Sequence, residues 1–198
     1  MRPADHMWWL ASRASGIVAL MLVTLSVAVG LAMAGKVMRR PGLGKVMMAL
    51  HEHSSLAALI AIGVHGVTLL GDQFLNPSLL DISVPLAGNY RPVYTSVGIL
   101  GGYLAALLGL TFYFRHRIGA KRWRSAHRAT ILVYAMAVVH TLGAGTDAGW
   151  LRWFVIVSGV PILCLLVIRM LPRQAPAKSK RAPRSREPNQ LRPETQAQ

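Results

Sequence analysis

Five apolar segments, separated by short polar loops, decide what this chain can fold into. The segments cover residues 9–34, 50–70, 95–114, 126–143 and 150–171. A run of about 20 apolar residues is long enough to span a bilayer. Hydrocarbon offers backbone groups no hydrogen-bond partner, so each spanning segment must be helical. The sequence therefore predicts an all-α integral membrane bundle of about five transmembrane helices within residues 1–172.

The charge of the chain is unusual in amount and in distribution. Only 15% of the residues are charged and 53% are hydrophobic, whereas soluble domains carry about 25% charge. A formal net charge of +15 first suggests a nucleic-acid partner. However, the lysines and arginines are concentrated in the loops and in the C-terminal tail, as in the cytoplasmic loops of membrane proteins. We therefore expect membrane lipid as a partner and no nucleic acid.

The basic residues also predict the orientation of the bundle. If the five segments alternate in direction, all but four of the 22 lysines and arginines fall on one side. The four exceptions are Arg2, Arg13, Arg91 and Arg152. The positive-inside rule then places the N-terminus outside and the C-terminus in the cytoplasm. Residues 173–198, rich in Pro, Arg, Lys and Gln, are expected to form a basic, disordered cytoplasmic tail.

Four of the seven histidines lie on two of the predicted helices, at similar depths. His65 and His140 lie within apolar stretches, while His51 and His127 lie near the cytoplasmic starts of the same two segments. Ionisable residues in a membrane are costly, so each one is a candidate for a functional site. The spacing of 14 between His51 and His65 puts both on one helix face, about 21 Å apart along the axis.

The other pair fits an ideal helix less well. A spacing of 13 gives about 19.5 Å of rise, but it leaves His127 and His140 about 140° apart around the axis. A tightened 3₁₀ stretch, or a first ligand at the start of the helix, would reduce this mismatch. His53 is an alternative inner ligand, although its spacing of 12 from His65 leaves it about 120° away on an ideal helix.

The two histidine-bearing segments run in the same direction, so His51 is predicted to be level with His127, and His65 with His140. Each pair could supply two axial imidazoles to one haem iron, which favours electron transfer because no axial position stays open. The chain has one cysteine, Cys164, and no CxxCH motif, which argues against covalent haem attachment. A zinc or di-iron site is disfavoured because the chain has no HExxH motif and carboxylates are nearly absent from the spans. For any single histidine, a hydrogen-bonded helix contact remains the alternative.

At these residues the chain resembles the ferric reductase-like transmembrane domain family. This family includes ferric reductases, the NADPH oxidases and the haem-binding membrane subunit of the bacterial periplasmic methionine sulfoxide reductase. The resemblance covers about residues 8–172 and rests on three features. They are the histidine spacings of 14 and 13, the opening WWLASRASGIVALMLVTLSVAVGL, and the segment WRSAHRATILVYAMAVVHTLGAGTD.

The resemblance implies one or two haem b groups held by His51, His65, His127 and His140, with electrons crossing from cytoplasm to exterior. It also implies a multi-pass protein of a bacterial cell membrane that acts as the electron-transfer subunit of an oxidoreductase. No flavin or nicotinamide domain follows residue 172 in this sequence, and the family commonly has six spans rather than five. We therefore expect a separate reductase or quinol as donor, with FMN or quinone from a partner, and a soluble extracytoplasmic protein as a potential acceptor.

Four arginines are candidate partners of the haem propionates. Arg13 and Arg91 are expected on the outer side, and Arg124 and Arg128 on the inner side. The alternative for each is a side chain that extends to the lipid headgroups. Small residues at helical spacing, Gly98, Gly102 and Ala106, indicate either close helix packing or room for a flat macrocycle.

Two other functions compete with electron transfer. A metal or small-solute transporter would use the histidines as pathway ligands, and broken spans or inverted repeats would favour it. A structural membrane anchor for a partner complex would not need the histidines at all. The sequence does not identify the terminal electron acceptor.

Overall fold

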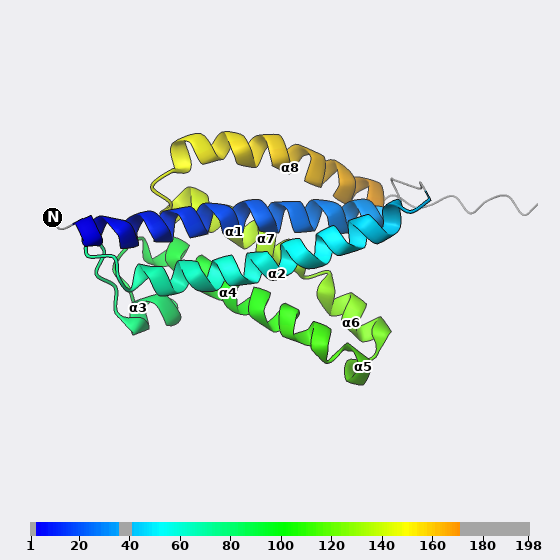
Figure 1. Ribbon diagram of the computed structural model, residues 1–198, viewed down its shortest axis with the longest axis horizontal. Helices are drawn as coiled ribbons and strands as arrows, with labels where there is room; N and C mark the ends of the chain where they lie inside the picture. The colour runs from blue at the N-terminus through cyan, green and yellow to red at the C-terminus, as the bar shows by residue number, and fades with distance from the viewer. Residues whose placement is uncertain (1–2, 36–40, 171–198) are drawn as a thin grey trace, which may run out of the picture.

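The computed structural model describes residues 3–35 and 41–170, and these residues form a bundle of helices (Figure 1). The helices are α1 Pro3–Gly35, α2 Leu43–Leu69, α3 Leu79–Ser83, α4 Pro92–Tyr113, α5 Arg115–Ile118, α6 Ala120–His127, α7 Thr130–Ala144 and α8 Ala148–Met170. This confirms the all-α fold class for the described part of the chain. The predicted tail, 173–198, and the basic residues Lys36, Arg39 and Arg40 lie outside the described residues.

Four of these helices, α1, α2, α4 and α8, are long and apolar enough to cross a membrane. Their bounds agree with four of the five predicted segments, although α2 begins at Leu43, well before the apolar run. The remaining segment, 126–143, is divided between the end of α6 and the 15-residue α7. At 1.5 Å per residue α7 is about 22 Å long, shorter than a hydrocarbon core of about 30 Å.

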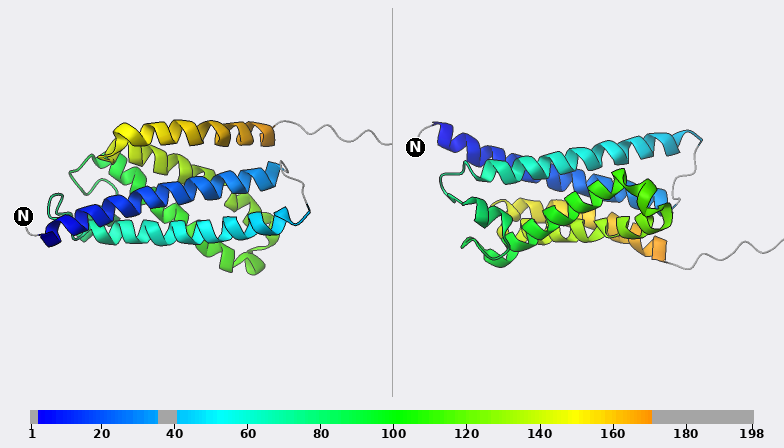
Figure 2. Two further views of the ribbon diagram at one scale, coloured as in Figure 1. Left: turned by 45° about the horizontal axis from the view of Figure 1, so that its top comes forward. Right: turned by 90° about the horizontal axis from the view of Figure 1, so that it is seen from below.

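The helices run roughly along one common axis, with α1 near the middle (Figures 1 and 2). The antiparallel helix α2 lies along one side of α1, and α8 lies along another side. Helix α7 contacts α1, α8 and α4, so that α4 completes the bundle on the side away from α8. The start of α1, the end of α2, the start of α4 and the end of α7 thus meet at one end, which we name the His65 end. The opposite end, with α5 and α6, is the His51 end.

Apolar side chains both fill the bundle and cover its outside. The interior cluster joins α1, α2 and α8 through Val23, Val27, Leu31, Ala58 and Ile162. Large apolar side chains also point outward; examples are Ile60, Val67, Leu107, Val157 and Leu163, each more than half exposed. A soluble protein rarely exposes so much contiguous apolar surface, whereas lipid covers it without penalty.

The loop between α2 and α4 contains the short helix α3. The hydroxyl of Ser78 accepts from the Asp81 N–H, and the Asp81 carboxylate accepts from the Ser78 N–H and hydroxyl, which makes a capping box. The two hydrogen bonds that the Asp81 carboxylate accepts from Ser78 lower the pKa of Asp81, and the bond from the backbone N–H contributes more than the bond from the hydroxyl. The hydroxyl of Tyr103 donates to the Ser83 carbonyl at 2.5 Å and ties α3 to α4.

Candidate functional site

The four histidines at matched spacing form two pairs, one between α2 and the end of α6 and one between α2 and α7. The ring of His51 lies 5.8 Å from that of His127, between centroids, with the planes at 89°. The ring of His65 lies 6.3 Å from that of His140, with the planes at 71°. All four side chains are half-buried, and the pairs lie toward opposite ends of the bundle. The structure thus brings together the pairs that the sequence spacing predicted.

Three of these imidazoles are held by the backbone of a neighbouring helix. Nδ1 of His65 lies 2.7 Å from the Ser12 carbonyl, and Nδ1 of His51 lies 2.9 Å from the Ser26 carbonyl. Nδ1 of His140 lies 2.9 Å from the Tyr94 carbonyl. Because a carbonyl oxygen only accepts, each Nδ1 must carry the proton, and in the neutral ring Nε2 then has a free lone pair. Such an outer partner fixes the tautomer and orientation of a ligating histidine.

A glycine lies against each of the same three rings. A Cβ on Gly16 would be 3.0 Å from Nδ1 of His65, and one on Gly30 would be 3.2 Å from Cε1 of His51. A Cβ on Gly98 would be 2.7 Å from Cε1 of His140, closer than real Cβ atoms approach. Glycine thus leaves room for each imidazole against the helix backbone: a Cβ at Gly98 would force a shift, and one at Gly16 or Gly30 would make a tight contact.

The carbonyl and the glycine belong to one repeated arrangement. In each case the accepting carbonyl lies four residues before the glycine, one turn away on the same helix face. The three carbonyl–glycine pairs are Ser12 and Gly16, Ser26 and Gly30, and Tyr94 and Gly98. The sequence patterns did not single out Gly16 and Gly30, and they indicated for Gly98 only close packing or room for a macrocycle. The available signal was the motif SxxxG, which occurs twice in the first span, 14 residues apart.

The junction of α6 and α7 lies between His127 and His140 and is tightened. Backbone N–H groups of Arg128, Ala129, Ile131 and Leu132 donate to carbonyls three residues earlier, as in a 3₁₀ helix. A 3₁₀ turn advances each residue by about 120° rather than about 100°, which removes part of the mismatch of an ideal helix. The 3₁₀ stretch considered from the spacing of 13 is therefore present.

His127 is held differently from the other three histidines. Within the described residues, its ring makes no hydrogen bond to a carbonyl; instead it stacks on Trp123, with centroids 5.1 Å apart and planes at 23°.

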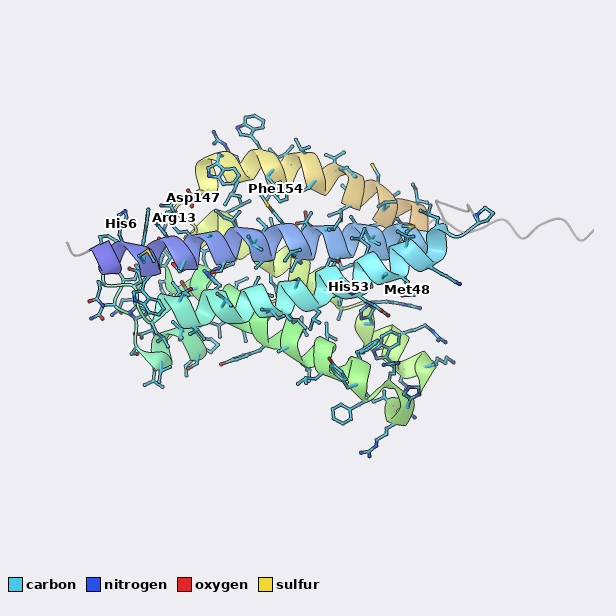
Figure 3. The ribbon with its side chains drawn as sticks, in the orientation of Figure 1. His6, Arg13, Met48, His53, Asp147 and Phe154 are labelled. Carbon is cyan, nitrogen blue, oxygen red and sulfur yellow. The ribbon has the colours of Figure 1, made fainter. Side chains whose placement is uncertain are left out.

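The four candidate arginines lie near the two ends, in unequal surroundings. Arg13 pairs with Asp147 through Nε at 2.8 Å and through a second, shorter contact, and its guanidinium lies 4.1 Å from the Trp9 ring (Figure 3). Arg91 donates to the Gly143 carbonyl at 2.5 Å, one turn before Tyr94. Arg124 and Arg128 are exposed beside α6. Their role as propionate partners stays a prediction.

The other three histidines lie outside the two pairs. His53 is exposed on α2, and its Nδ1 donates to the Ala49 carbonyl of its own helix at 2.7 Å (Figure 3). His6 and His116 are exposed, as expected of surface histidines. The geometry therefore favours His51 over His53 as the partner of His127.

The donor set suits a cofactor that brings most of its own ligands. Among residues 3–35 and 41–170, no three His, Cys, Asp or Glu side chains gather closely enough to hold a metal ion. Structural zinc needs four protein ligands, whereas the iron of haem needs only its axial ligands from the protein. Two imidazoles on opposite sides of one metal, each bonded at about 2 Å, have centroids roughly 6 Å apart. The measured separations match that value, and the glycines remove the Cβ atoms that would push the rings aside.

Comparison with known proteins adds no relative. No family model matches the chain, and neither a curated protein nor a solved structure matches it.

Proposed function

We propose that this chain binds haem b at two levels, between His65 and His140 and between His51 and His127, and relays electrons across a membrane. The observation that carries the proposal is the facing of two imidazole pairs, with three of the four Nδ1 atoms turned to backbone carbonyls. That arrangement leaves Nε2 of each of these rings available to a metal. His51, His65, His127 and His140 would hold the haem b, which would supply a one-electron couple there.

The protein holds and orients the imidazole rings, and it separates the two proposed haem sites with apolar side chains. The carbonyls of Ser12, Ser26 and Tyr94 hold the rings in one tautomer, so little reorganisation accompanies a change of charge at the metal. An apolar layer separates the two levels: Val23 and Val27 lie between Gly16 and Gly30 on α1, and Ala58 lies between the histidines of α2. This layer excludes water between the two sites. Because the two proposed sites lie about 20 Å apart along the helix axis, an electron that crosses the membrane would do so in shorter transfers.

The proposed topology places the His65 end outside and the His51 end in the cytoplasm. The basic residues of the described chain follow that division: Arg115, Arg117, Lys121, Arg122 and Arg124 are all on α5 and α6 at the His51 end. At the other end the described chain has Arg13, Arg91 and Arg152, and Asp147 neutralises Arg13. With the tightened junction before it, α7 would make the fifth crossing. The orientation follows from the positive-inside rule.

The electron donor would be a separate reductase or a quinol at the cytoplasmic side, with FMN or quinone as its cofactor. The acceptor would lie outside, on a soluble extracytoplasmic protein or a small oxidant. In this role the chain is the membrane subunit of an oxidoreductase in a bacterial cell membrane. The resemblance to the ferric reductase-like family supports this assignment, and the paired histidines are the residues that carry it.

A reduced-minus-oxidised spectrum of the purified protein, with haem counted per chain, tests the proposal. We expect a b-type α-band and up to two haems per chain after haem-replete expression. A transporter or a structural anchor predicts no such band. Absence of haem from folded, haem-replete protein would overturn the assignment.

A further inference from the structure

The two histidine pairs differ in what orients them. At the His65 end both imidazoles donate to a helix carbonyl. At the His51 end only His51 does so, and Nδ1 of His127 has no carbonyl partner within the described residues. A metal-bound imidazole that lacks such a partner is free to rotate about its metal bond unless something else restrains the plane of the ring.

Trp123 is the group in contact with the plane of that ring. Its indole lies one turn before His127 on α6 and stacks at 23° with centroids 5.1 Å apart. Trp123 is in turn fixed from α4, because its ring lies 6.2 Å from Phe112 in an edge contact. A chain of aromatic contacts thus connects α4 through α6 to the pair of His51 and His127, whose planes are perpendicular at 89°.

The N–H of Trp123 makes no contribution to holding the helix in place. Its Nε1 is buried and has no hydrogen-bond partner in the described part of the chain. The residue also borders an open cavity of about 360 Å³, lined by Arg115, His116, Ala120 and Arg124, so its surroundings are not tightly packed. A tryptophan that makes neither a hydrogen bond nor a full core contact, yet stacks on a candidate ligand, points to a role in positioning.

We propose that Trp123 is the positioning residue of His127, and that its aromatic face replaces the carbonyl that orients each of the other three histidines. This inference rests on the proposed haem sites. It predicts that the two haems are inequivalent, because the inner haem, at the His51 end, has one ligand, His127, that is restrained by stacking alone. Removing the aromatic face should therefore alter the inner site and leave the outer site intact.

The test compares Trp123→Phe with Trp123→Leu in the full chain. Phenylalanine keeps an aromatic face; it removes an N–H that has no partner in the described residues, together with the second ring of the indole, so its effect should be smaller than that of leucine. Leucine removes the face. The readout is the low-spin ferric electron paramagnetic resonance spectrum, because its g-values report the angle between the two axial imidazole planes. Haem content and carbon monoxide binding by the reduced protein are measured as well. Gly98→Ala, which should perturb the site of His140, identifies which signal comes from the outer haem at the His65 end.

We expect Trp123→Leu to shift or lose one of two low-spin signals, with carbon monoxide binding at up to one haem per chain. Trp123→Phe should keep both signals, and the outer signal should persist in both variants as a control for folding. If the leucine variant does not accumulate, Trp123→Met repeats the test with a long, non-aromatic side chain. The inference is overturned if the non-aromatic variant keeps both signals, or if phenylalanine shifts the inner signal as much. Wild-type protein without haem would instead refute the proposed function itself, and the positioning role with it.

Discussion

A methyl group added at Gly98 should disable one histidine pair while leaving the other intact. The new Cβ would lie 2.7 Å from Cε1 and 2.8 Å from Cγ of His140, inside van der Waals contact. The imidazole cannot simply retreat, because its Nδ1 is bonded to the Tyr94 carbonyl of the same helix as Gly98. Gly98→Ala must therefore break that hydrogen bond or push α4 and α7 apart.

The magnitude follows from three terms. Overpacking costs about 1–3 kcal/mol and the lost hydrogen bond about 0.5–1.5 kcal/mol. Replacing a helical glycine by alanine returns about 0.5–1 kcal/mol. The net effect of Gly98→Ala is a destabilisation of about 0.5–4 kcal/mol. Gly63→Ala is the matched control: nothing lies within 4 Å of its Cβ, so it should be neutral or stabilising.

Gly16→Ala and Gly30→Ala extend the comparison to the other two rings. Their nearest ring atoms are 3.0 Å and 3.2 Å from the added Cβ, so the predicted order of damage is Gly98, then Gly16, then Gly30. The assay is haem per chain together with the thermal midpoint of the detergent-purified protein. If Gly98→Ala keeps full haem content, an unchanged spectrum and the thermal midpoint of Gly63→Ala, the close approach of this glycine to His140 has no functional meaning.

Three further predictions follow from single contacts. His140→Ala should remove the outer haem and His127→Ala the inner one, each leaving about one haem per chain where the wild type holds two, counted as the pyridine haemochrome. Arg13→Ala should lower the thermal midpoint by breaking the half-exposed ion pair to Asp147, worth about 1 kcal/mol or less after solvent screening, and haem content should persist if the arginine serves only to join α1 to α8. The lowered pKa of Asp81 means that its capping bonds stabilise α3 above the ordinary carboxyl pKa and lose that effect as the pH falls through the lowered value. Protection factors for amide exchange in α3, which correct for the slower intrinsic exchange in acid, should therefore fall with the pH, and unchanged protection factors would contradict this.

The apolar runs predicted the long helices well, because a spanning segment has no alternative to helical structure. They did not predict where α2 begins: the helix starts at Leu43, and the added residues 43–49, LGKVMMA, are mostly apolar and are interrupted by the single charge of Lys45. Nor did they reveal that the segment 126–143 is divided. The run is evenly apolar after Arg128, and only the poor angular fit of a 13-residue spacing indicated the tightened junction.

The pairing of the histidines could be predicted because it depends on rise and direction alone, which a helix fixes from sequence spacing. The perpendicular planes of His51 and His127 could not, since ring orientation depends on the carbonyl and indole that contact each ring. The ion pair of Arg13 with Asp147 could not be predicted either. Asp147 lies 134 residues away in sequence, and no local pattern indicates that the two groups meet.

The glycines give the strongest physical connection between sequence and site. On antiparallel helices two pairs of contacts stay level only if the spacings on the two helices are equal. Gly16 and Gly30 are 14 residues apart, as are His51 and His65. Gly16 therefore lies against His65, and Gly30 lies against His51. A helix built merely for close packing would need small residues at every turn of its contact. This helix instead has bulky Val23 and Val27 between its two glycines and reserves glycine for the levels of the imidazoles. The glycine spacing of the first span thus matches the histidine spacing of the second, as the proposed binding of haem at two fixed heights would require.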